Sequence, residues 1–262
     1  MPFTLAHPAV VLPLLRTPLV PSALVAGAMA PDLPYYVSLQ WLGGDYNLTL
    51  THESSSVLWL DPIIGLVLLA TFQLLLKSPL LALLPPSAAG RAVPAARGFR
   101  WRGSVALGLI AVSLVVGAVT HLVWDELTRF PGQPWALRLE VAFSVLGGVA
   151  LLGWLARWWG TTPPQPVPDG VLLPRPLRTG VAALLAAVAV VAGAVAAARR
   201  LTEIREAYRV DGVVDRVGVA EAELRTFLVE GGTAFLVALV VYAVGWHVHR
   251  AFTRRAEQLT SP

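Results

Sequence analysis

The sequence predicts an all-α protein, a polytopic membrane helix bundle of about five spans with a broken, re-entrant N-terminal helical segment. Apolar side chains make up 56% of the 262 residues and charged ones 14%, which is too hydrophobic for an ordinary soluble domain. The apolar residues also form several runs of roughly twenty, long enough to cross a bilayer as helices. Basic residues lie in short loops between these runs, as membrane topology requires, so we expect no nucleic-acid partner.

Prolines interrupt the first apolar stretch, residues 3–37. Proline removes a backbone donor and kinks a helix, so a straight span is not expected here. We predict short broken helices instead, one of them over residues 22–30 with Ser22 as its N-cap. The mixed, polar residues 38–61 predict an interfacial loop.

Five longer apolar runs follow. Asp61-Pro62 is typical of a helix start, with Asp as the N-cap and Pro at the first helical position. A basic loop without an acid is predicted between the first two runs, and one or two amphipathic helices between the last two, over residues 199–231. The predicted spans are residues 61–83, 104–124, 141–159, 179–198 and 232–249.

This order of elements divides the chain into two parts. Residues 1–160 form the predicted membrane domain with the candidate site. Residues 161–262 contribute two further spans and the amphipathic segment, packed as one unit. The sequence leaves the oligomeric state open.

Charge counting predicts the orientation. If the loop after the first span is cytoplasmic, the inner segments 77–102, 157–178 and 250–262 carry a net charge of +9 and the remainder −5. The positive-inside rule selects this arrangement, with a cytoplasmic C-terminus. The end of the second span and residue His52 then lie on the extracytoplasmic face.

The stretch GAVTHLVWDELT, residues 117–128, carries the clearest site signal. His121 and Asp125 stand four residues apart, so on a helix both side chains project from one face within reach of a shared ion. Polar groups at the end of a membrane span are costly to bury unless they are paired or bound. An interfacial helix end is the alternative explanation for the pair.

Three further residues complete a candidate metal set: His7, Asp32 and His52. Histidine and carboxylate are the ligands of zinc, manganese and iron sites, and the chain has no cysteine that could supply thiolates. Each of the three also has an ordinary explanation, as a core histidine, a turn aspartate and a loop histidine. In one straight helix His7 and Asp32 would lie roughly 37 Å apart, so a shared site requires the N-terminal segment to fold back as a buried hairpin.

The opening MPFTLAHPAV, then ALVAGAMAPDLPYY, Thr51-His52, GAVTHLVWDELT and VAFSVLGG resemble an uncharacterised bacterial integral membrane family whose members begin MPFT, a histidine and a proline. The resemblance covers roughly residues 1–160. That family is more distantly similar to membrane-bound metal-dependent hydrolases, which are likened to zinc-dependent phospholipases. The resemblance implies a bacterial plasma-membrane protein whose metal ligands are His7, Asp32, His52, His121 and Asp125.

Two positions depart from the family pattern. Family members often have a further histidine where this chain has Arg129, and a small residue in place of Glu126. Arginine cannot ligate a cation, although it can bind a phosphate. If the replaced histidine is a ligand in the family, the metal or the activity differs here.

These observations support three hypotheses. The first is a hydrolase of lipid-like phosphoesters that uses a divalent metal, zinc in preference to magnesium or manganese, with Glu126 or Glu53 as the base. Its substrate would be held by Arg129, Arg138 and Glu140. The second is a magnesium enzyme acting on an isoprenoid diphosphate by ionisation, cyclisation or transfer. The third is non-enzymatic, either a metal-stabilised membrane protein or a small transporter, although a transporter should show an internal repeat.

Overall fold

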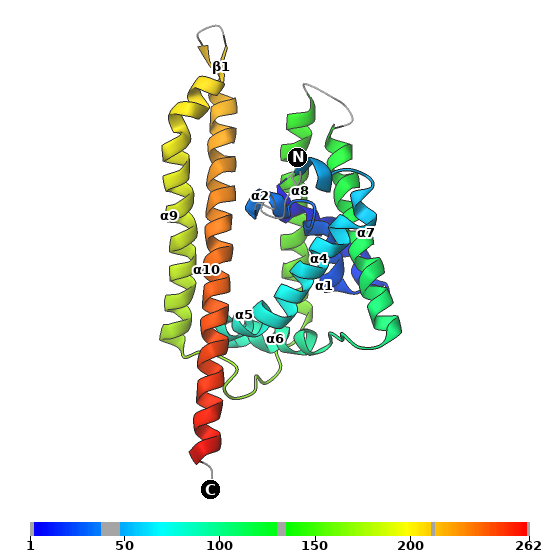
Figure 1. Ribbon diagram of the computed structural model, residues 1–262, viewed down its shortest axis with the longest axis vertical. Coiled ribbons are helices and arrows are strands. Elements are labelled where there is room, and N and C mark those ends of the chain that lie inside the picture. Colours follow the sequence, from blue (N-terminus) through cyan, green and yellow to red (C-terminus); the bar gives the residue numbers. More distant parts are fainter. Residues whose placement is uncertain (1–2, 38–47, 130–134, 211–212, 261–262) are drawn as a thin grey trace. The chain divides into compact units, whose positions relative to one another are not determined.

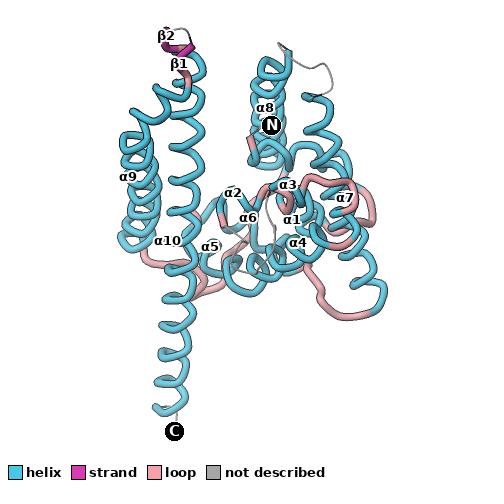
Figure 2. Tube along the Cα trace, turned by 45° about the horizontal axis from the view of Figure 1, so that its top comes forward, coloured by secondary structure: helices cyan, strands magenta, loops and turns pink. Residues whose placement is uncertain are grey.

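The computed structural model confirms the all-α fold class (Figure 1). It describes residues 3–37, 48–129, 135–210 and 213–260, so residues 38–47 of the predicted interfacial loop lie outside the described part. The only strands in these ranges are the two-residue β1 (Arg209–Val210) and β2 (Val213–Val214), which pair antiparallel (Figure 2). The main helices are η1 (Thr4–Arg16), α1 (Pro21–Met29), α2 (Leu33–Tyr36), α3 (Leu48–Thr51), η3 (Ser56–Leu58), α4 (Leu60–Ala70), η4 (Thr71–Leu76), α5 (Lys77–Leu83), α6 (Pro86–Arg97), α7 (Ser104–Arg129), α8 (Trp135–Thr161), α9 (Arg175–Ala207) and α10 (Arg216–Thr260).

The chain forms two compact units. Unit 1 comprises residues 1–74 and 87–166, and unit 2 comprises residues 75–86 and 167–262. The observed division lies six residues beyond the expected boundary at residue 160, and the segment 75–86 joins unit 2. All five predicted metal ligands belong to unit 1.

The N-terminal segment of unit 1 is broken into short helices, as its prolines predict. The 3₁₀ helix η1 contains Pro8 and Pro13, and α1 has Pro21 at its first position. The predicted cap Ser22 lies inside α1 and accepts a hydrogen bond from the amide of Gln73. Because η1 packs against α1 and both pack against α7, the chain folds back between His7 and Asp32.

Within the described residues, five helical segments are long and apolar enough to cross a membrane: residues 60–83, 104–129, 138–161, 175–207 and 216–253. Their lengths and compositions are those of an integral membrane protein. Most are longer than predicted, because charged residues at their ends continue the helix beyond the apolar run. The first is not regular, since residues 71–76 form a π-helical turn.

Three local predictions differ from the structure. Asp61 does not cap α4, whose N-cap is Trp59, but is buried in the first turn. The predicted basic loop after the first span contains helix α6. The charged residues 199–231 form no separate amphipathic helices, because they extend α9 and begin α10 on either side of the β1–β2 hairpin.

Unit 2 is built on the long helices α9 and α10, which pack against each other. Glycines allow the close approach, because a side chain at Gly193 would meet Phe227 and one at Gly231 would meet the carbonyl of Ala189. Small residues at such contacts are characteristic of helix pairs in lipid.

Two glycines also bring α1 against α7 in unit 1. A side chain at Gly27 would overlap the carbonyl of Leu114, and one at Gly117 would overlap the backbone of Leu24 and Ala28. The contact therefore requires glycine on both helices. It lies one turn from His121 and sets how closely α1 approaches that residue.

We predict that Gly117→Ala lowers the thermal unfolding midpoint of the purified protein, because overpacking a close contact costs about 1–3 kcal/mol. Gly108→Ala is the matched control on the same helix, since a methyl group there meets nothing within 4 Å. Tryptophan fluorescence during heating measures both. Equal destabilisation by the two variants would contradict the proposed role of this contact.

Candidate metal centre

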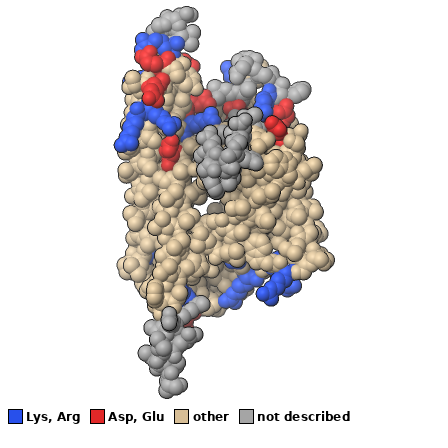
Figure 3. Space-filling model, viewed as in Figure 1, with Lys and Arg blue, Asp and Glu red and all other residues tan. Residues whose placement is uncertain are grey.

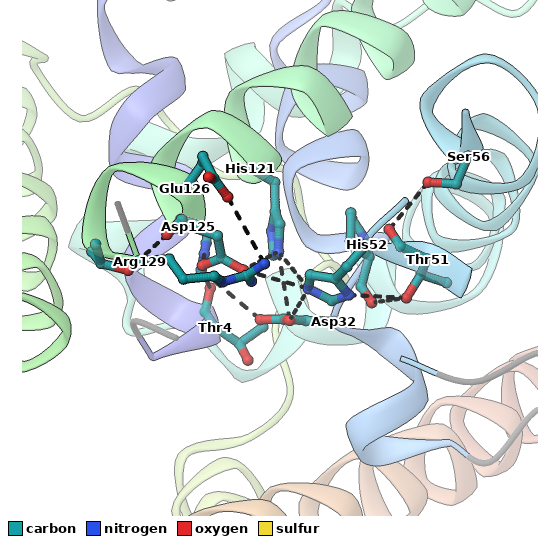
Figure 4. A network of polar contacts seen from close by, with 12 residues as sticks. Thr4, Asp32, Thr51, His52, Ser56, His121, Asp125, Glu126 and Arg129 are labelled. Atoms are coloured by element: carbon teal, nitrogen blue, oxygen red, sulfur yellow. Dashed lines mark hydrogen bonds and ion pairs between the residues drawn. The ribbon is translucent and has the colours of Figure 1, made fainter. Parts of the chain in front are cut away.

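Four separate segments bring His7, Asp32, His52, His121 and Asp125 together in unit 1. His7 comes from η1, Asp32 from the turn between α1 and α2, His52 from the turn after α3, and the other two from α7. Figure 4 shows His52, His121, Asp32 and Asp125 converging. Two overlapping groups have ligand atoms within 4.8 Å of one another: His7, His121 and Asp125, and Asp32, His52 and His121.

Three of these side chains, Asp32, His52 and His121, have the mutual spacing of ligands around one ion, and Asp125 lies at a similar distance from both histidines. The Nε2 atoms of His52 and His121 are 3.4 Å apart, and each lies 3.5 Å from Oδ1 of Asp32. Oδ2 of Asp125 is 3.5 Å from Nε2 of His52 and 3.7 Å from Nε2 of His121. Ligands at about 2.1 Å from a tetrahedral zinc ion lie about 3.4 Å apart, so the spacing fits such an ion.

His7 lies beside this set and contacts the other carboxylate oxygens. Its Nε2 is 3.1 Å from Oδ1 of Asp125, and its Nδ1 is 3.9 Å from Oδ2 of Asp32. The imidazole ring stacks on that of His121, with ring centroids 3.9 Å apart and planes 14° apart.

Hydrogen bonds at the far side of each ring determine which nitrogen faces the group. Nδ1 of His121 is 2.7 Å from the carbonyl of Ala28, and Nδ1 of His7 is 3.3 Å from the carbonyl of Thr4. Since a carbonyl only accepts, each Nδ1 carries the hydrogen. In the neutral ring of His121, Nε2 is then the lone-pair nitrogen, whereas Nε2 of His7 also lies within hydrogen-bond distance of the carboxylate of Asp125.

Nδ1 of His52 also carries the hydrogen, because it is hydrogen-bonded to the hydroxyl of Thr51. The hydroxyl of Thr51 donates to the carbonyl of Pro31 at 2.8 Å, which leaves its oxygen to accept from Nδ1 of His52 at 3.2 Å. With an ion bound, these Nδ1 hydrogen bonds would leave all three Nε2 atoms free to ligate it, whereas in this structure Nε2 of His7 donates to Oδ1 of Asp125 at 3.1 Å. Ligating histidines in metal centres have the same outer hydrogen bonds.

The five candidate ligands are largely buried, so a net charge on them is unfavourable in free energy unless it is compensated. His7, Asp32, His121 and Asp125 are at most 2% exposed, and the side chain of His52 is 8% exposed. Oδ1 of Asp32 and Oδ2 of Asp125, the oxygens closest to Nε2 of His52 and His121, have no hydrogen-bond donor among the described residues. Buried carboxylates require a compensating charge.

The lowered pKa of Asp32 indicates that this carboxylate is ionised. Burial by itself would raise its pKa, but the contact with Nε2 of His52, 3.5 Å away, and the positive charge of His121 and His7 when protonated outweigh burial and hold the pKa below its ordinary value. Two imidazolium ions could balance the charge, but His7 and His121 are stacked and would repel each other if both were charged. A divalent cation fits this donor set without that repulsion.

The remaining predicted site residues lie outside the group. No glutamate belongs to either set of possible ligands in the described part of the chain. Glu126 and Arg129 are exposed and form an ion pair of 3.8 Å. Glu53 is exposed and Glu140 half-buried, while the guanidinium of Arg138 lies 5.1 Å from the ring of Trp135.

Several supporting residues were missing from the sequence-based set. Thr51 orients His52, and Thr128 donates to the carbonyl of Asp125 at 2.8 Å. Ser56 contacts both Asp61, at 2.6 Å, and the carbonyl of Glu53, at 2.7 Å, which fixes the turn that carries His52. The sequence signal for Thr51 was its place directly before a candidate ligand.

The hydrogen-bond pattern predicts the ring tautomers in protein loaded with zinc. Nitrogen-15 NMR should show hydrogen on Nδ1 in His7, His52 and His121. His247 is an internal control, because its Nε2 lies 3.0 Å from the carbonyl of Leu75 and must carry the hydrogen. Hydrogen on Nε2 in any of the three candidate ligands would contradict this account.

Comparisons place the group within a known family. The model of a domain of unknown function, DUF4184, matches residues 1–137, a range that contains all five residues. No curated protein and no solved structure matches the chain. Membership of an uncharacterised family is therefore confirmed, whereas similarity to hydrolases stays a prediction. The chain belongs to the DUF4184 family.

Proposed function

We propose that this protein is a membrane-embedded, metal-dependent hydrolase of lipid-like phosphoesters, acting at the outer membrane face. The observation that carries the proposal is the pair of buried carboxylate oxygens, on Asp32 and Asp125, that lie 3.5 and 3.7 Å from histidine Nε2 atoms and have no hydrogen-bond partner among the described residues. Mixed imidazole and carboxylate ligands favour zinc over magnesium, which prefers oxygen ligands and retained waters. Zinc lowers the pKa of a bound water and polarises a scissile phosphoryl group.

The depth of the group supports a lipid substrate. Asp125 lies four residues before the end of α7, which places it about 6 Å inside that end of the helix. In a bilayer this is the boundary between hydrocarbon and headgroups, where a lipid phosphoester lies. His52 is the most exposed of the five candidate ligands, so we infer that substrate enters on its side.

Residues at the exposed end of α7 have roles in this proposal. Arg129 is 57% exposed and can hold a phosphate once its pairing with Glu126 opens. Glu126 or Glu53 serves as the base that takes the proton from the attacking water. The outer-face assignment rests on the charge distribution, since the basic segments of the sequence lie at the opposite ends of the spans.

A structural role for the ion is the second candidate. Two carboxylates and three histidines with little exposure can fill every position around an ion, as in closed structural zinc sites, whereas catalytic sites keep an open position. Such an ion would tie the α1–α2 turn, the α3 turn and α7 together, with η1 held against it through the contact of His7 with Asp125. The isoprenoid diphosphate hypothesis gains no support from three histidines.

Metal content tests the centre itself. His121→Ala and Asp125→Asn should each remove most of the bound divalent metal, measured by elemental analysis of protein purified without chelator. His249→Ala is the control, because this histidine lies in α10 of unit 2. If the site variants retained as much metal as wild type, there would be no metal centre here.

Activity separates the two candidate functions. Lipid extracts from cells that produce wild type or Asp125→Asn should differ in a phosphoester lipid, and zinc-loaded wild type should cleave that lipid after purification. Replacing the true base, by Glu126→Gln or Glu53→Gln, should slow cleavage about 10²–10⁴-fold without removing metal. Identical lipid profiles, together with unfolding on metal removal, would instead establish the structural role.

A further inference from the structure

Unit 1 carries an uncompensated basic surface at the end opposite the metal group. The sequence has no acidic residue from 62 to 124 or from 141 to 168. Arg97, Arg100 and Arg102 fall in the first of these ranges, and all three are exposed and without an ion pair in the described structure. Basic side chains without acidic neighbours are visible at the lower right of Figure 3.

Aromatic anchors hold this segment in place. Residues 98–102 alternate, so that Phe99 and Trp101 are half-buried while Arg100 and Arg102 are exposed. The two aromatic rings meet edge to face, with centroids 4.9 Å apart, and pack on the core cluster that includes Leu69 and Leu114. The exposed guanidinium groups are therefore presented by a fixed backbone.

Within the described part of unit 1, the neighbouring Arg91 forms contacts that Arg97, Arg100 and Arg102 do not form. Arg91 lies 4.2 Å from the ring of Trp159, and it donates to the carbonyls of Trp159 and Ser87 at 3.2 and 2.8 Å. These contacts join α6 to the end of α8. The packing of this end of unit 1 thus does not depend on Arg97, Arg100 or Arg102.

The position of the three arginines relative to α7 indicates the membrane surface at which they lie. Arg102 lies two residues before α7, and Asp125 lies near its far end, about 30 Å along the helix axis. This is the thickness of the hydrocarbon core. The three arginines and the metal group therefore lie at opposite membrane surfaces if α7 crosses the bilayer.

We propose that Arg97, Arg100 and Arg102 form a binding surface for anionic phospholipid headgroups. Guanidinium groups match phosphate geometry and form paired hydrogen bonds with it. Basic side chains next to a membrane surface attract anionic lipids, and each favours the charged lipid about fivefold. This surface is independent of the proposed hydrolase activity.

Lipid retention tests the surface. The full chain is placed in nanodiscs that contain phosphatidylcholine and anionic phosphatidylglycerol, and the lipids that remain bound after release are counted by native mass spectrometry. Wild type should retain phosphatidylglycerol in excess of its bulk fraction. The variant R97Q/R100Q/R102Q should lose that excess, by about fivefold or more.

A matched control removes the same charge elsewhere. R199Q/R205Q/R216Q replaces three exposed arginines of unit 2, which lie among acidic residues in the sequence, and should retain the excess. The proposal is overturned if R97Q/R100Q/R102Q keeps the wild-type excess, or if both variants lose it equally.

Salt dependence provides a test that needs no variant. Raising salt from about 0.1 to 1 M shortens the screening length from about 10 to 3 Å. The phosphatidylglycerol excess of wild type should fall accordingly. An excess that does not change with salt would overturn the electrostatic surface even if the triple variant failed to fold.

Discussion

Burial of two carboxylates among three histidines constrains the rest of unit 1. Each Nδ1 is held by a backbone carbonyl or by Thr51, so each Nε2 faces Asp32 or Asp125. This arrangement is unfavourable without a positive charge between the groups. Two of the accepting carbonyls lie at the end of α1. Ala28 is in the last turn of this helix, where carbonyls have no intrahelical partner, and Pro31, which accepts from Thr51, follows that end. The glycine contact between α1 and α7 brings the first of these carbonyls to His121.

Local spacing made part of this site predictable from sequence. His121 and Asp125 lie on one helix, so the helical period places them together. The prolines of residues 3–37 indicated a broken segment, and the distance between His7 and Asp32 showed that it had to fold back. The chain does so, and it carries His7 to Asp125.

Tertiary contacts made the rest unpredictable. The carbonyl of Ala28 and the hydroxyl of Thr51 become hydrogen-bond partners of the histidine rings only because α1, α3 and α7 pack together. Periodicity in the sequence does not predict which helices pack together. Helix ends were also misjudged, because a charged residue does not by itself end a helix; hence residues 199–231 extend α9 and α10. Asp61 looked like a helix cap, but its carboxylate accepts from Ser56 instead.

The two ends of α7 differ in the charged and polar side chains that lie near them. One end carries buried histidines and carboxylates, and the other is preceded by exposed arginines without acids. A divalent ion in the buried group is what the proposed chemistry depends on. X-ray absorption at the zinc edge of the zinc-loaded protein reports the ligands of that ion. We expect nitrogen and oxygen ligands at about 2.0–2.1 Å with outer-shell scattering from imidazole rings. A shell of oxygen alone, without imidazole scattering, would contradict this expectation.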